Sequence, residues 1–550
     1  MELSDGNVSS KVMDHLGIVA GVCQELGIAA RIDEKIGKQR SDRKLSCGTS
    51  TVAMIINGLG FTNRRLYLTS QFYESKATEL LLGEGIKPEE ITDSTLGQAL
   101  DEIADYGSSN LFSEIAYAMA KENGLLSGVN HLDSTSISVQ GDYQVKEGEE
   151  DAVLITHGYS KDKRADLKQV MLNLVVNGPA ELPLWMESLS GNTSDQKSFQ
   201  KTIKQVNEFE KQLKASPSLW VADAAFYTEE NLKSVDGSLW ISRVPESIKE
   251  AKTYIKLEDD AIDWIESDSD GYKYASFSSH YADIEQRWLL IFSEQAYSRE
   301  SVTFEKKLKK EAIALEKTLW HMSNSLFNCK TDAETALQKL AKKHPLFNIT
   351  FDVVEKHKYE KAGRPAKNTK KQTFYQLQAK LTRNDEALTV ALNSKGRFIL
   401  ATNNLDTSNL SDTHILSEYK AQSKAESGFR FIKSPDFMVD SIFLKKPKRI
   451  QALMVIMTLC LFVYNYAQHK LRTALQHYDL TIPNQKKKPI QNPTLKWVFQ
   501  LMEGIAIVSI TSSQQNLVTN MSPLRSRIVA LFGSHVSALY GVNSNSVNLS

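Results

Sequence analysis

The sequence contains little cysteine, and its cysteines are not paired. Cys23, Cys47, Cys329 and Cys460 are scattered over 550 residues and never form a Cys-x-x-Cys pair. This spacing argues against a zinc ribbon and against a disulfide framework, and it suits a reducing cytosol.

The chain also lacks an excess of charge of either sign. It has 66 basic and 66 acidic residues, so its formal net charge is zero. A globally basic nucleic-acid binder is therefore not indicated, and any contact with DNA must depend on local basic patches. Four such patches are present, although each alone also fits a solvated loop or helix face: 306–310, 356–371, 445–449 and 486–488.

No apolar run is long enough for a membrane span. The most apolar run, Ala452 to Tyr464, is shorter than the roughly 20 residues that a span needs, so we expect a buried helix. The first residues, Met1 to Asp5, show no basic region followed by an apolar core, and no signal peptide is expected. The sequence therefore predicts no membrane partner.

Several catalytic motifs are missing. The sequence has no Gly-x-Ser-x-Gly, no Walker-type phosphate loop and no paired metal-binding histidines, so serine-hydrolase and nucleotide-driven functions lack support. His157 stands close to Lys161, Lys163 and Arg164, which could suggest a histidine nuclease. A lone histidine near a turn is more often structural or exposed.

Residues 1–126 are predicted to form an all-α N-terminal domain. Apolar residues recur at helical spacing over 12–36 and 49–59, and further helices are expected over 92–106 and 111–121. Strongly periodic helices joined by short loops favour an independent module.

From residue 127 the pattern changes to strands. Strands are expected over 131–139, 153–156, 167–176 and 182–189, followed by a helix from Ser194 or Asp195 to Leu213. The apolar run 219–227 has the character of a strand that is buried on both faces, and 240–243 gives one more strand. We therefore predict an α/β fold, a mixed sheet with helices on its faces, whose first part spans 127–243.

The rest of the chain is predicted to hold an insertion, a second core part and a tail. Residues 244–396 mix helical patterns (304–322 and 332–343) with strand patterns (288–292, 347–354 and 374–381), and we interpret them as an inserted mixed β/α region. Residues 397–500 return to the core with a strand at 396–403 and a long apolar helix at 450–471. Residues 501–550 form a C-terminal tail, and a last helix is expected over 495–505.

One predicted helix, 412–433, carries two distinct faces. Asp412 or Thr413 can cap its start, and Pro435 stops it. At about 100° per residue, one stripe that can pack contains Ala421, Ala425, Phe429 and Ile432, whereas Tyr419, Gln422, Glu426 and Lys433 fall within about 60° of one another. The second face could hold a metal ion beside a phosphodiester. A solvated amphipathic face is the alternative.

Three acidic residues are the candidate catalytic and metal-binding groups: Asp133, Asp223 and Glu426. Asp223 interrupts the apolar run 219–227, where a charge costs free energy unless it is paired or metal-bound. Asp133 alone could be a surface or turn residue, because it lies among serines and threonines. Two divalent cations about 4 Å apart can activate the attacking oxygen and stabilise the leaving oxygen of a phosphodiester. Mg²⁺ needs only a few carboxylates for this.

The order and spacing of these residues resemble a known family. Tyr419, Glu426 and Lys433 match the Tyr-x-x-Arg-x-x-x-Glu-x-x-x-x-x-x-Lys signature of the DDE transposases of bacterial insertion sequences, in the IS-four-like group, and Gln422 stands where the signature has Arg. The segments 56–61 and 95–101 resemble the helical N-terminal domain of one branch. The resemblance implies a ribonuclease-H-like core with Asp133 in its first strand, Asp223 after its fourth strand and Glu426 on a following helix.

The resemblance also implies a function. The expected enzyme is a DNA transposase that cleaves element ends and transfers strands into target DNA with two Mg²⁺ ions, for which Mn²⁺ can substitute. Tyr419, Gln422, Arg430 and Lys433 are the expected DNA-binding residues, and Gln422 brings no charge to its position. The N-terminal domain would bind element ends or make multimer contacts, although a helical domain without DNA contact is the alternative.

The expected partners are the double-stranded terminal repeats and target DNA, bound by a homodimer in the cytoplasm, at the bacterial nucleoid. Two alternatives to a transposase stay open: a metal-dependent nuclease without strand transfer, and a non-catalytic DNA-binding derivative. The family's base-holding Trp is not assigned by a motif, and core packing is expected for Trp288 and Trp320.

Overall fold

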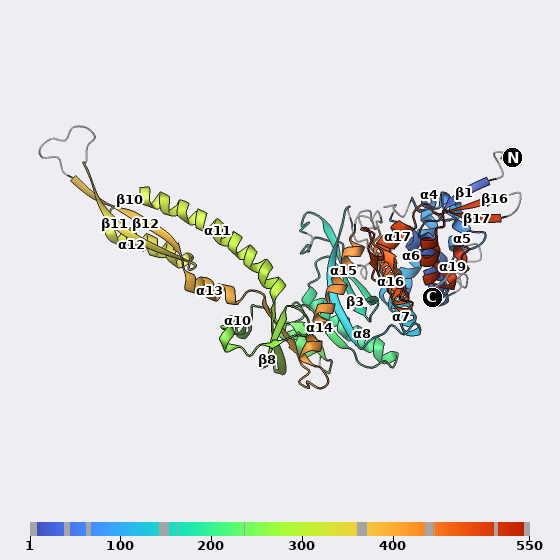
Figure 1. Cartoon of the computed structure of the whole chain (residues 1–550), viewed down its shortest axis with the longest axis horizontal. Helices are drawn as coiled ribbons and strands as arrows, with labels where there is room; N and C mark the ends of the chain where they lie inside the picture. Colours follow the sequence, from blue (N-terminus) through green and yellow to red (C-terminus); the bar gives the residue numbers. More distant parts are fainter. Residues whose placement is uncertain are drawn as a thin grey trace. The chain divides into compact units, whose positions relative to one another are not determined.

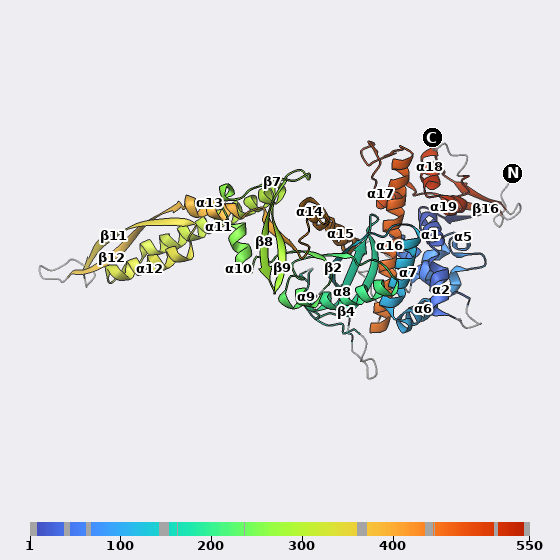
Figure 2. The same cartoon turned by 90° about the horizontal axis from the view of Figure 1, so that it is seen from below.

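The chain folds into two compact units. A computed structural model describes all residues except 1–7, 38–43, 62–67, 142, 144–152, 162, 236, 360–370, 435–443, 445, 511–514 and 544–550. The first unit comprises Met1–Ile241 and Glu418–Ser550, and the second comprises Ser242–Ser417. Figures 1 and 2 show the elements of both units.

The first unit begins with the predicted helices. They are α1 (Leu16–Glu25), α2 (Ile28–Ile36), α3 (Cys47–Leu59), α4 (Thr69–Glu74), α5 (Thr78–Leu82), α6 (Asp93–Tyr106) and α7 (Ser108–Glu122). The single helix predicted over 12–36 is divided, because Gly27 adopts a left-handed conformation with φ of 62° between α1 and α2. Ser46 caps α3 by accepting a hydrogen bond from the backbone N–H of Thr49 at 2.9 Å.

The N-terminal region is not entirely α-helical. Strand β1 (Val8–Val12) pairs in antiparallel register with β16 (Ala506–Ile510), which pairs in turn with β17 (Gln515–Thr519). The predicted helix 495–505 ends earlier, as α17 (Leu495–Leu501). Two further helices, α18 (Pro523–Leu531) and α19 (Ser534–Leu539), follow, and α19 packs against α1. Segments near the two ends of the sequence therefore pair in one sheet and pack together. Their long separation in the sequence prevented a prediction of this pairing.

The central sheet of the first unit consists of β4 (Leu182–Ser190), β3 (Lys168–Asn177), β2 (Val129–Val139) and β5 (Leu219–Ala222), in that order. The β4–β3 and β3–β2 pairs are antiparallel, and β2–β5 is parallel. Nearly every residue of β3 is buried, because helices including α8 (Asp195–Gln212) cover the sheet. The predicted strand 153–156 is wrong, since Thr156 makes only an isolated bridge to Gln169.

This strand order is the ribonuclease-H-like order. The first three core strands form an antiparallel meander, and the fourth returns beside the first through α8. Beyond β5, the short helix α9 (Glu229–Ser234) leads to β6 (Trp240–Arg243), the next strand of the core. The predicted fold class, α/β with a mixed sheet, is confirmed.

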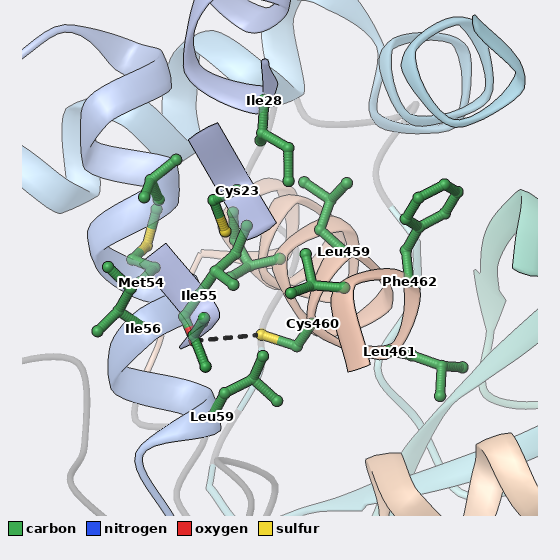
Figure 3. Close-up of a cluster of buried hydrophobic side chains, with 14 of the residues drawn as sticks. Cys23, Ile28, Met54, Ile55, Ile56, Leu59, Leu459, Cys460, Leu461 and Phe462 are labelled. Atoms are coloured by element: carbon green, nitrogen blue, oxygen red, sulfur yellow. Dashed lines mark hydrogen bonds between the residues drawn. The ribbon is translucent and has the colours of Figure 1, made fainter. Parts of the chain in front are cut away.

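Helix α16 (Pro447–His477) is the centre of the first unit's hydrophobic core. It packs against α3, α6, α7 and β4, and 18 of its 31 residues are buried. Figure 3 shows Leu459, Cys460, Leu461 and Phe462 of α16 beside residues of α1, α2 and α3, and the Cys460 thiol donates a weak bond to the Ile55 carbonyl at 3.8 Å. The N-terminal helices and one face of the sheet therefore share one core.

The apolar run 452–464 is buried in α16, as predicted. The helix is longer than this run, and by length and composition α16 could cross a membrane, since its most apolar 18 residues have a mean hydropathy of 1.7. However, 83% of its most apolar 18 residues are buried inside the protein. It is therefore a core helix.

The second unit has a sheet and a long hairpin. Its sheet strands are β13 (Arg397–Thr402), β9 (Ile284–Ser293), β8 (Tyr272–Tyr281) and β7 (Ile265–Glu266), all antiparallel. The hairpin strands β11 (Phe347–Tyr359) and β12 (Lys371–Arg383) pack with α11 (Glu294–Asn324) and α12 (Lys330–Lys343) around a small apolar core. Other elements of this unit include α10 (Lys249–Ile255), β10 (Leu326–Phe327) and α13 (Asp385–Asn393). The mixed β/α character predicted for 244–396 is confirmed.

The two tryptophans considered in this region differ. Trp288 is fully buried in β9, as expected. Trp320 is 62% exposed on α11, so the expected core packing is wrong. The buried residues of this helix, Leu308, Leu315 and Leu319, lie on a different stripe, because Trp320 follows Leu319 by about 100° around the helix.

Removal of a large side chain from the shared core should destabilise the first unit. We expect Phe462→Ala, at a fully buried position, to lower the free energy of unfolding by about 3–5 kcal/mol through lost burial and an unfilled cavity. The exposed Lys448→Ala on the same helix should change it by no more than about 0.5 kcal/mol. Urea unfolding followed by far-UV circular dichroism measures both. If both substitutions changed the free energy of unfolding equally, α16 would not lie at the centre of the core.

Candidate active site

The pairing of β2 with β5 brings the two predicted aspartates together. In the parallel register, Leu132 lies opposite Ala222. Asp133 and Asp223 are the next residue in each chain segment, and neighbouring strands lie about 4.8 Å apart. Strand β5 ends at Ala222, earlier than the run 219–227 suggested, and Asp223 begins a turn. The Asp223 carboxylate accepts the backbone N–H of Ala225 at 2.9 Å, which holds it at the end of the strand.

The predicted helix 412–433 consists of two helices. Helix α14 (Asp412–Ala421) and α15 (Ser423–Ile432) meet at Gln422, whose backbone N–H bonds to the Tyr419 carbonyl instead of continuing the α-helical pattern. The predicted cap is wrong, because the Ser411 hydroxyl accepts the backbone N–H of His414 at 3.2 Å. Pro435, the predicted stop, lies outside the described residues.

Helix α15 carries Glu426 toward the sheet. It contacts β2, β3 and α16 (Figure 1). Phe429 and Ile432 are buried, so the predicted packing stripe is confirmed at these positions. Gly428 allows the close approach to α16, since a Cβ atom there would lie 3.0 Å from the Leu461 side chain. Glu426 is exposed, and its charge contributes to the raised pKa of Asp133.

Burial dominates the electrostatics of the two aspartates. It raises the pKa of Asp133 to about 7, and the charges of Asp223 and Glu426 add to this rise. Burial also raises the pKa of Asp223, and the neighbouring Asp195 acts in the same direction. The Lys161 ammonium opposes both shifts, as do backbone hydrogen bonds to each carboxylate. Burial therefore disfavours the ionised form of both aspartates more than Lys161 and the backbone hydrogen bonds favour it.

Two charged residues at the site were not predicted to belong to it. In the sequence Lys161 stands close to His157, and Asp195 is one of two predicted caps of the helix that ends at Leu213. The Lys161 ammonium lies 3.0 Å from the Asp195 carboxylate and donates to the Ser134 hydroxyl at 2.8 Å. Neither residue stands in a motif, so only the contacts of Lys161 with Ser134 and with Asp195 identify them.

The predicted DNA-binding residues differ in their accessibility. Arg430 is exposed, and Tyr419 and Lys433 are partly buried. Gln422 is only 7% exposed, because it lies at the junction of α14 and α15. Other parts of the protein cover the Gln422 side chain, so this side chain would contact a phosphate only after a rearrangement that exposes it.

The donor set of the site suits a hard divalent cation. Every candidate ligand is a carboxylate oxygen, the type that Mg²⁺ and Mn²⁺ prefer. Two adjoining carboxylates with pKa values raised by burial are stabilised by added positive charge. Within the described part of the chain, no three Asp, Glu, His or Cys side chains are grouped closely enough to hold an ion together. The two half-buried aspartates are therefore the preformed part of the site.

Comparison with protein families assigns most of the chain. The family described as "Transposase DDE domain" matches residues 127–463, which include the sheet and α15. The chain belongs to the DDE transposase family. The function of this domain is DNA transposition, and the enzyme is a DDE-type transposase. A domain of unknown function, DUF4277, matches residues 8–117 of this transposase.

Solved structures give weaker likenesses. A piggyBac transposase synaptic complex with hairpin DNA is 8% identical, with a TM-score of 0.36, and the alignment covers 91% of this chain and 82% of that one. A Mos1 transposase paired-end complex with the left transposon end is 12% identical, with a TM-score of 0.15, over 37% and 60% of the two chains. No curated protein sequence matches. The assignment of this transposase therefore depends on the family match and on the strand order.

The raised pKa of Asp133 has a consequence for stability. The folded pKa, about 7, exceeds the unfolded value, so ionised Asp133 destabilises the ion-free protein above pH 7. This penalty shrinks as the pH falls from 7 towards 4 and vanishes below the unfolded pKa. With a chelator present, Asp133→Asn should raise the melting temperature most above pH 7 and progressively less towards pH 4. Thermal unfolding across this range measures the effect, on the order of a few kcal/mol at about 1.4 kcal/mol per pKa unit.

The matched control is Asp105→Asn, which changes an exposed carboxylate on α6. It should give a difference from the parent protein that is small at every pH. If the increase in melting temperature caused by Asp133→Asn instead grew as the pH fell, burial would not destabilise the ionised Asp133 carboxylate.

Proposed function

We propose that Asp133, Asp223 and Glu426 are the catalytic carboxylates of this transposase and that they hold two Mg²⁺ ions, for which Mn²⁺ can substitute. The observation that carries the proposal is the β2–β5 register, which sets Asp133 beside Asp223 although 90 residues separate them (223 − 133 = 90). Glu426 on α15 supplies the third charge, since it acts on Asp133.

The reaction needs two phosphodiester exchanges at one site. Water first attacks the phosphodiester at the element end, and the freed 3′ hydroxyl then attacks a phosphodiester of the target DNA. Bound divalent ions supply positive charge that activates the attacking oxygen and stabilises the leaving oxygen. The protein contributes rigidity, because Asp133 lies within a paired strand and Asp223 is held by the turn that follows β5.

The substrate is double-stranded DNA, both the terminal repeats and the target. Arg430, Tyr419 and Lys433 lie on α14 and α15 or directly after them, on the chain segment that carries Glu426, and we assign phosphate contacts near the cut end to these three side chains. Gln422 is left out because it is buried. Binding of both element ends requires two copies of the chain, so we infer a homodimer on DNA, with residues 1–126 binding ends or joining the copies. A cytoplasmic, nucleoid-associated location follows from this substrate.

Removal of one aspartate should abolish cleavage. Asp223→Ala is expected to lower Mg²⁺-dependent cutting of DNA that carries the element's ends by more than about a hundredfold, because transition-state charge stabilisation is lost. Asp166→Ala, which removes an exposed carboxylate paired with Arg164, should retain activity close to that of the parent. Cleavage by Asp223→Ala at the parental rate would refute the site assignment.

The same reaction mixture separates the proposal from its nearest alternative. Joined products with target DNA are expected together with cleavage. Cleavage without joined products would indicate a nuclease without strand transfer. Binding without cleavage by the parent protein would indicate a non-catalytic derivative.

The assigned phosphate contacts should appear in the salt dependence of binding. Because each phosphate contact releases counterions, affinity should fall steeply as salt rises, and Arg430→Ala should reduce the slope of log K against log salt by about one. Lys211→Ala, at an exposed position of α8, removes an equal charge and should leave the slope unchanged. Fluorescence anisotropy with end DNA measures both. An unchanged slope for Arg430→Ala would remove this residue from the interface.

A further inference from the structure

The Lys161 ammonium lies in a cage of oxygen atoms next to the two aspartates. It donates to the Ser134 carbonyl at 2.7 Å and to the Ser134 hydroxyl at 2.8 Å, and it lies 3.0 Å from the Asp195 carboxylate. Ser134 directly follows Asp133 on β2. Two hydrogen bonds and one ion pair therefore define the position of the ammonium.

The backbone of the same residue is also fixed to β2. The Lys161 N–H donates to the Ser136 hydroxyl at 3.1 Å. Backbone and side chain are therefore anchored two residues apart on the strand that carries Asp133. The side chain is 29% exposed, which places the charge at the edge of the site and within reach of both solvent and Asp133.

Asp195 holds this lysine from the opposite side. It is the first residue of α8, where a carboxylate is favoured by the helix dipole. Its side chain is 22% exposed, and its charge acts on Asp223. The ion pair thus acts electrostatically on both aspartates: the charge of Lys161 acts on Asp133 and Asp223, and the charge of Asp195 acts on Asp223.

We propose that Lys161 is a resident counter-cation of the active site, held in place by Asp195 and Ser134, and that it offsets the repulsion between Asp133 and Asp223 before divalent ions bind. Lys161 and Asp195 are positioning residues and not catalytic ones. The inference rests on the proposed function, since it takes these aspartates as the ion-binding groups.

The counter-cation has two opposing effects. In the ion-free protein it lowers the free energy of two adjoining, half-buried carboxylates. When divalent ions bind, its positive charge repels them, so the site binds ions more weakly than the carboxylates alone would. A lysine suits this because its ammonium is a compact charge on a flexible stem. Lys161 thereby keeps the carboxylates in place. The site also binds divalent ions less tightly than the same carboxylates would without a neighbouring cation.

The test is Mg²⁺ binding to the full-length chain with Lys161→Met. Mg²⁺ is titrated alone and thermal unfolding is followed at each concentration. Without Mg²⁺, the Lys161→Met variant should have a lower melting temperature than the parent protein. It should also show a half-saturating Mg²⁺ concentration that falls about tenfold, because the removed charge repels the ion at close range. Lys161→Arg keeps the charge and should stay within about threefold of the parent. Lys163→Met removes an exposed lysine of the same loop and should change neither quantity.

The ion pair itself is tested by combining variants. If Asp195 holds Lys161, the loss of stability in Lys161→Met with Asp195→Asn should be smaller than the sum of the two single losses. Additive losses would remove Asp195 from the proposal. An unchanged or raised half-saturating Mg²⁺ concentration in Lys161→Met would overturn the counter-cation, since a purely structural lysine would lower stability without tightening ion binding.

Failure of this inference is distinguishable from failure of the proposed function. Asp223→Ala in the same titration should lose the Mg²⁺-induced rise in melting temperature. If Asp223→Ala loses it and Lys161→Met behaves as the parent does, the counter-cation is wrong and the catalytic assignment stands. If Asp223→Ala keeps the full rise, the ions bind elsewhere and both proposals fail.

Discussion

The parallel pairing of β2 with β5 is the constraint on which the site depends. Leu132 and Ala222 are partners in this pairing, and each is followed by an aspartate. A shift of the register by one residue would turn one of the carboxylates to the other face of the sheet. Apolar partners on both sides of the sheet make such a shift costly, so the hydrophobic core fixes the distance between two charges that repel each other.

The third carboxylate depends on helix packing instead of strand pairing. Helix α15 is held by buried Phe429 and Ile432 and by the close approach of Gly428 to Leu461 on α16. Because α16 is also the centre of the core that the N-terminal helices share, the position of Glu426 is coupled to the folding of the whole first unit. Glu426 is exposed whereas the aspartates are half-buried, which divides the site into a rigid part and a more accessible part.

Local periodicity predicted most helices and strands. It failed where a single backbone conformation interrupts a helix and where a strand depends on a partner that is distant in the sequence. The helix over 12–36 is interrupted at Gly27, and the helix over 412–433 changes its hydrogen bonding at Gln422. The spacing of apolar residues did not reveal either break, because helical spacing continues across both. The segment 153–156 has β character but only a bridge to pair with. Strand β1 was missed because its partner, β16, lies about 500 residues away in the sequence.

The sequence by itself determined the identity and order of the three acidic residues, the change from helical to strand periodicity near residue 127, and the apolar helix that became α16. These are properties of spacing within one segment, which the chain carries before it folds. Only the tertiary structure decided that Asp133 and Asp223 adjoin, that Gln422 is buried, and that Lys161 and Asp195 stand beside the aspartates. Pairing register, burial and ion pairs join residues far apart in the chain, and no local pattern encodes a distance between segments that meet only when the core forms.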